Sequence, residues 1–113
     1  MEVVKYTYGD FTGLQIKDVK LKMRKQIFFL LRIVDPDTAS EYNVDVDAAI
    51  QNVLRTYGSL NELLGYPPEM VEVMVMLNAA YQEFLKGPDM SWKTYRKLIL
   101  DACGAVRKIK EVQ

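Results

Sequence analysis

The chain has 113 residues, of which 50% are hydrophobic and 27% are charged, and its formal net charge is zero. This length supports one domain with a single core, and no apolar run approaches the roughly 18 residues that a membrane-spanning helix needs. A single cysteine excludes an internal disulfide and is typical of a reducing compartment. We therefore expect one domain over residues 1–113, in the cytoplasm and without contact with a membrane.

The side chains of the first residues alternate in character along the chain, as in a β-strand, and valine and tyrosine are frequent among them. Residues 3–8 are followed by Gly9 and Asp10, which suit a two-residue turn, and then by residues 11–14. Because an isolated two-stranded hairpin is marginally stable in water, residues 1–16 are expected as an appendage that packs against the rest of the domain. The pattern is compatible with a short N-terminal β-hairpin but does not require one.

The next segment is predicted to be a helix that has Asp18 as its N-cap and ends before Asp35 and Pro36. Its apolar residues recur at steps of three and four, the spacing of one helix face. They are Val19, Met23, Ile27, Leu30 and Val34. Residues 17–32 carry a net charge of +5, so this helix is strongly basic.

Residues 35–43 are predicted to be an irregular loop, and Asn43 or Asp45 is expected to cap the helix that follows. That helix is predicted to break at Gly58. The residues after Gly58, Ser-Leu-Asn-Glu, match a capping box and would therefore start a short separate turn.

The segment from Pro67 to Lys86 is strongly apolar and helical in its periodicity. Its core face is predicted to contain Met70, Val73, Leu77, Ala80 and Phe84. The opposite face, which includes Glu83, should be polar, yet Met76 and Ala79 fall on it and Val75 lies alongside. We therefore take Val75, Met76 and Ala79 as candidate partner-binding residues. The alternative is that the methionines only fill the core.

The last helix is predicted to begin near Asp89 or Ser91, after a stop at Gly87 and Pro88. One face of this segment keeps three-four spacing over its whole length. Its residues are Trp92, Tyr95, Ile99, Ala102, Val106 and Ile109.

Four amphipathic segments with short connections predict a mainly α protein, with an antiparallel four-helix bundle as the natural closed arrangement. In an up-and-down bundle the first and last helices are neighbours, so their basic residues would share one face. The residues concerned are Lys20, Arg24, Lys93, Arg96, Lys97, Arg107 and Lys108. A positive face of this kind can contact the phosphates of nucleic acid, although a solvated basic face is the commoner explanation.

The sequence lacks the residue patterns that most catalytic and metal-binding sites require. There is no histidine, which removes the commonest general base and the histidine-activated nucleophiles. The acids after residue 34 do not form a calcium loop, because Ser40 and Val46 stand where an EF-hand needs glycine and glutamate. Cys103 lies on an apolar stripe, where a packed thiol is the usual case. We therefore expect no catalytic residue, no cofactor and no metal.

These features favour a non-catalytic protein–protein interaction module that also self-associates. It would act as an adaptor, inhibitor, assembly factor or complex subunit, such as those that phages and mobile elements encode. Its partner would be another protein, a second copy, or both. The alternative is a nucleic-acid-binding accessory protein that uses the basic face, and a carboxylate-dependent enzyme is a distant third.

Overall fold

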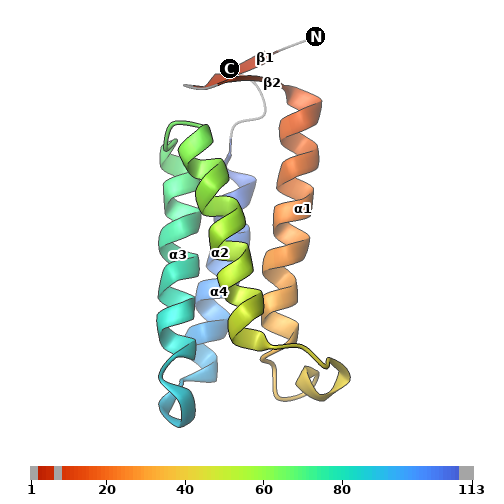
Figure 1. The fold of residues 1–113 in the computed structure, drawn as a ribbon, viewed down its shortest axis with the longest axis vertical. Coiled ribbons are helices and arrows are strands. Elements are labelled where there is room, and N and C mark those ends of the chain that lie inside the picture. Colours follow the sequence, from red (N-terminus) through yellow and green to blue (C-terminus); the bar gives the residue numbers. More distant parts are fainter. Residues whose placement is uncertain (1–2, 7–8, 110–113) are drawn as a thin grey trace.

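In a computed structural model the chain is mainly helical (Figure 1). The structure describes residues 3–6 and 9–109, with side chains from Ile16 to Ile109. The elements are β1 (Val3–Tyr6), β2 (Gly9–Thr12), α1 (Gly13–Arg32), the 3₁₀ helix η1 (Ala39–Glu41), α2 (Val46–Leu63), α3 (Pro68–Phe84), the 3₁₀ helix η2 (Gly87–Asp89) and α4 (Trp92–Arg107). No helix in the described part of the chain is long and apolar enough to cross a bilayer.

All four α-helices contribute side chains to one hydrophobic core. The predicted core row of α3 is buried from Met70 through Val73 and Leu77 to Ala80, whereas Phe84 at its end is only half-buried. The predicted row of α4 is buried from Tyr95 to Ile109, whereas Trp92 at its start is only half-buried. Burial of these rows at helical spacing is what holds the helices together.

α4 packs against both α3 and α1. Near the end of α4, the Lys20 Nζ of α1 donates hydrogen bonds to the carbonyl oxygens of Arg107 (3.0 Å) and Ile109 (2.8 Å). Near the start of α4, the hydroxyl of Tyr95 donates to the carbonyl oxygen of Leu30 at 2.8 Å. The first turns of α1 therefore lie beside the last turn of α4, and the first and last helices are neighbours.

The start of α1 differs from the prediction. Asp18 was expected to be the N-cap, whereas α1 already begins at Gly13. The physical reason is that Ile16 is buried and extends the core row of the helix by one turn. Asp18 instead pairs with Lys22 one turn further on, at 3.2 Å.

The two strands also differ from the predicted pattern. β1 and β2 pair in antiparallel register, with Val3 opposite Thr12 and Tyr6 opposite Gly9. The prediction of a turn at Gly9 and Asp10 is wrong, because both residues belong to β2. Residues 7–8 lie outside the described residues.

The predicted break in the second helix is wrong, because α2 runs through Gly58 without interruption. Its buried side continues past this glycine, with Val53, Tyr57 and Asn61 following one another at steps of four. Tertiary packing therefore overrides the low helix propensity of glycine here. The expected cap is confirmed, since Asp45 Oδ1 accepts a hydrogen bond from the Ala48 N–H at 3.0 Å.

The continuity of α2 can be tested at Gly58. A Cβ added there would meet Met74 Cε at 3.6 Å, an ordinary van der Waals contact. Because alanine loses less backbone entropy than glycine in a helix, we expect Gly58→Ala to raise the free energy of unfolding by about 0.5–1 kcal/mol. Urea unfolding should show a higher midpoint with an unchanged slope. A lower midpoint would contradict an unbroken helix at this position.

Candidate functional site

The solvent side of α3 carries no charge over three turns. Val71 is 38% exposed and Val75 is 58% exposed, and the exposed side chains that continue the same row are Asn78 and Gln82. We call Val71, Val75, Asn78 and Gln82 the α3 stripe. Two exposed valines in an uncharged row on the solvent side of a helix make this row a candidate surface for a partner.

The other two predicted partner-binding residues lie at the edge of this stripe. Met76 and Ala79 are half-buried, and Met76 packs against the core. Their row faces α4, because Glu72 on the same row pairs with Lys108 at 3.4 Å. The border with α4 explains why apolar residues interrupt a row that was expected to be polar.

Glu83, which was expected to be solvated, is only 6% exposed. Its carboxylate pairs with Lys86 Nζ at 3.1 Å and accepts a hydrogen bond from the Ser91 N–H at 3.5 Å. The prediction was wrong because the turn between α3 and α4 folds back over this side chain. A turn of this kind is not visible in helical periodicity.

The predicted basic residues fall into three with a partner that fixes the side chain and four that lie on the outer surface. Lys97 pairs with Asp101 at 2.9 Å, Lys108 pairs with Glu72, and Lys20 bonds to the end of α4. Arg24 and Arg107 come together on the outer face of α1 and α4, and the side chains of Lys93 and Arg96 are exposed on α4. The seven residues therefore do not form one uniform face.

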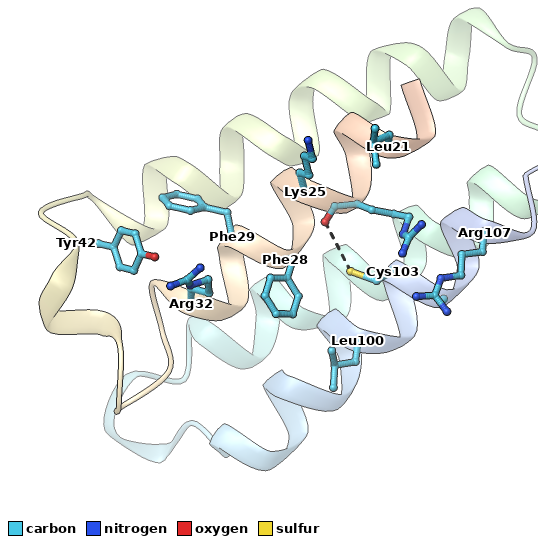
Figure 2. Close-up of a pocket in the computed structure, with 11 residues that line it drawn as sticks. Leu21, Lys25, Phe28, Phe29, Arg32, Tyr42, Leu100, Cys103 and Arg107 are labelled. Carbon is cyan, nitrogen blue, oxygen red and sulfur yellow. Dashed lines mark hydrogen bonds between the residues drawn. The ribbon is translucent and has the colours of Figure 1, made fainter. Parts of the chain in front are cut away.

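A groove of about 610 Å³ lies between α1 and α4 (Figure 2). Its apolar part includes Leu21 and Phe28, which are 48% and 45% exposed. The full lining is Leu21, Arg24, Lys25, Phe28, Phe29, Arg32, Tyr42, Leu100, Cys103, Gly104 and Arg107. Four of these side chains are cationic and none is a carboxylate. We call this feature the α1/α4 groove.

Contacts inside the α1/α4 groove fix its two ends. At one end the Arg32 guanidinium lies 5.7 Å from the centre of the Tyr42 ring, and that ring meets Phe29 edge-on with ring centroids 5.4 Å apart. Towards the other end the Cys103 thiol faces the Arg24 carbonyl oxygen at 4.0 Å (Figure 2). The groove therefore has an aromatic end and an arginine-rich end.

The groove does not activate its cysteine. Burial raises the pKa of the Cys103 thiol, and the positive charges of Arg24 and Arg107 oppose this shift without cancelling it. The thiolate, which is the reactive form, is therefore disfavoured. This environment suits a packed thiol rather than a nucleophile.

Of the acids that follow α1, Asp35, Asp45 and Asp47 accept hydrogen bonds through their carboxylates. Asp47 accepts hydrogen bonds from Gln51 (2.6 Å) and from the Tyr81 hydroxyl (2.7 Å). These bonds, first from Gln51 and then from Tyr81, lower the pKa of Asp47. Among residues with described side chains, no group of three or more His, Cys, Asp or Glu is placed to hold a metal ion.

Sequence reasoning missed the α1/α4 groove. A signal for it was present, because Leu21 and Phe28 are seven residues apart and lie off the core row of α1. Two large apolar residues on one outward side of a basic helix indicate a second apolar surface. The contribution of Leu100 and Gly104 from α4 follows only from the packing of the two helices.

Comparisons of the chain with protein-family models, curated proteins and solved structures found no match.

Proposed function

We propose that the protein is a non-catalytic protein–protein interaction module of the cytoplasm, built as an antiparallel four-helix bundle. It serves as an adaptor, inhibitor, assembly factor or complex subunit. The observation that carries this proposal is the α3 stripe, in which Val75 is 58% exposed beside Val71. Met76 and Ala79 form the edge of the contact surface.

The energetics of the stripe favour a covered state. Burying the exposed parts of Val71 and Val75 at about 25 cal/mol per Å² contributes on the order of 1–2 kcal/mol for each residue. Asn78 and Gln82 continue the row with amide groups, which can donate and accept hydrogen bonds to a partner. The stripe therefore combines an apolar centre with a polar end, as protein interfaces do.

Binding rather than catalysis is further supported by the chemistry of the chain. It has no histidine, and burial disfavours the thiolate of Cys103. A nucleophile or general base would have to come from residues without an activating partner in the groove. Neither the stripe nor the groove offers such an arrangement.

Nucleic-acid binding is the weaker candidate for the basic residues. Lys97 and Lys108 are paired with carboxylates, and Lys20 is bonded to the end of α4. These contacts reduce the positive charge that the outer face can offer to phosphates. The exposed apolar side chains in the α1/α4 groove are also unlike a phosphate-binding surface.

A photo-cross-linking residue placed at position 75 tests the proposed contact surface in the cells that normally make the protein. We expect discrete covalent adducts with another protein at this position, and none at the exposed control position Thr56 of α2. Adding Val71→Glu should weaken the adducts about tenfold, which corresponds to about 1.4 kcal/mol of contact energy. Equal labelling at positions 75 and 56 would contradict the proposal.

A further inference from the structure

The α1/α4 groove presents an unusual combination of groups. Leu21 and Phe28 expose apolar surface, while Arg24, Lys25 and Arg107 surround it with positive charge. Its occupant must therefore be anionic and must also carry an apolar side chain. A duplex nucleic acid satisfies the first requirement but not the second, since phosphates do not cover a leucine or a phenylalanine.

The chain itself contains a segment with the complementary chemistry. Residues 35–45, which we call the acidic loop, hold four carboxylates and no lysine or arginine. Asp37, Glu41 and Asp45 are exposed, and Val44 among them is 43% exposed. The acidic loop thus offers negative charge around an apolar side chain, whereas the groove offers positive charge around apolar side chains.

The acidic loop is held in shape before it meets any partner. The Asp37 N–H donates to Asp35 Oδ1 at 2.9 Å, and the Thr38 hydroxyl donates to the Arg32 carbonyl oxygen at 2.6 Å. The Tyr42 ring is fixed against Phe29. Docking a loop that is already ordered costs less conformational entropy than docking a flexible one.

The positions of loop and groove allow a closed pair. The acidic loop adjoins the aromatic end of the groove, where Tyr42 lies, and Arg107 lies towards the opposite end (Figure 2). From Leu21 to Arg32 the groove extends about 16 Å along α1, at 1.5 Å per residue. When two copies face each other with their grooves antiparallel, each loop meets the arginine-rich end of the other groove. Phe28 of each copy then lies near the twofold axis.

We infer that the α1/α4 groove binds the acidic loop of a second copy, so that the protein is a twofold-symmetric dimer. Closed twofold dimers are the commonest homo-oligomers, and every contact in them occurs twice. Charge complementarity sets the antiparallel register, and the apolar groups in the groove contribute the burial. This surface is separate from the α3 stripe, so the inference does not depend on the proposed partner of that stripe.

Solution mass tests the dimer directly. Sedimentation equilibrium of the full chain should give a mass of twice 13.0 kDa. Because salt at about 1 M shortens the Debye length to about 3 Å, the dissociation constant should rise at least about tenfold between about 0.05 M and 1 M salt. A mass of 13.0 kDa at every concentration up to saturation would overturn the inference.

Charge reversal identifies the contacting surfaces. We expect Arg107→Glu, in the groove, and Glu41→Lys, in the acidic loop, each to raise the dissociation constant at least a hundredfold. An equimolar mixture of the two variants should recover the wild-type affinity, because each groove then faces a loop of opposite charge. Arg55→Glu on α2 makes the same charge change at an exposed arginine outside the groove and should leave the dimer intact. Failure of the mixture to recover would overturn the inference.

Two further variants test whether the dimer forms through the groove rather than through the α3 stripe. Gly104→Phe fills the groove without changing charge, since a Cβ at Gly104 has no atom within 4 Å, and it should give a folded monomer by circular dichroism and mass. Val75→Glu on the α3 stripe should leave the dimer unchanged. Loss of the dimer in Val75→Glu, or a monomer that binds duplex DNA through Arg107, would overturn the inference while leaving the α3 stripe open to its own test.

Discussion

Replacing Leu77 by alanine is expected to lower the free energy of unfolding by about 2–5 kcal/mol. Leu77 is buried in the core between α3 and its neighbours. The truncation removes apolar contacts and leaves a cavity that the surrounding helices fill only in part. Urea unfolding followed by circular dichroism measures the loss.

Val75→Ala on the same helix is the matched control for Leu77→Ala. Val75 is exposed in the isolated chain, so its truncation should change the free energy of unfolding by no more than about 0.5 kcal/mol. The two residues are two positions apart and point to opposite sides of α3. Equal losses at both positions would contradict the orientation of α3 on which the contact surface depends.

Tyr95→Phe is expected to cost about 1–3 kcal/mol, although it removes only one oxygen atom. The Tyr95 hydroxyl donates to the carbonyl oxygen of Leu30, which lies in the last turns of α1. Carbonyl groups at the end of a helix lack a helical N–H donor, and the Val34 N–H bonds to Leu31 rather than to Leu30. The variant leaves this buried carbonyl group without the hydroxyl that satisfies it.

The buried hydroxyl of Tyr95 should also make the free energy of unfolding depend on pH. Burial raises the pKa of Tyr95 above its ordinary value, so the folded state binds the phenol proton more tightly than the unfolded state. Its contribution to stability is therefore complete below about pH 10 and is lost as the pH rises above that value. Urea unfolding at alkaline pH should show a steeper loss in the wild type than in Tyr95→Phe. Parallel losses in both proteins would assign the effect to other tyrosines.

The rows of buried residues were predictable because they depend on local spacing. Met70, Val73 and Leu77 repeat at helical steps, and the structure buries all three. The ends of helices were less predictable. Gly58 and Asp18 carry strong local signals for a helix break and a helix start. Burial of Tyr57 and Leu64 on either side of Gly58, and burial of Ile16 before Asp18, outweighs those signals. Local propensity is a small term beside tertiary packing.

The surfaces were harder to predict than the core. Val75 could be identified from the sequence as an apolar residue outside the core row, and it lies on the α3 stripe. The α1/α4 groove could not be assembled, because it needs the pairing of Phe28 with Leu100 and Gly104 from a helix some seventy residues away. Which side chains two helices bring together depends on their rotation and register, and these are set by the whole core.

Hydroxyl-radical footprinting of the chain in its native cell extract, compared with the purified protein, tests most directly whether the α3 stripe is a contact surface. Side chains that a partner covers react more slowly with the radical. Oxidation at Val71 and Val75 should fall several-fold in the extract, while oxidation of the exposed Leu63 at the end of α2 should not change. Equal oxidation of the stripe in both samples would contradict the proposed function.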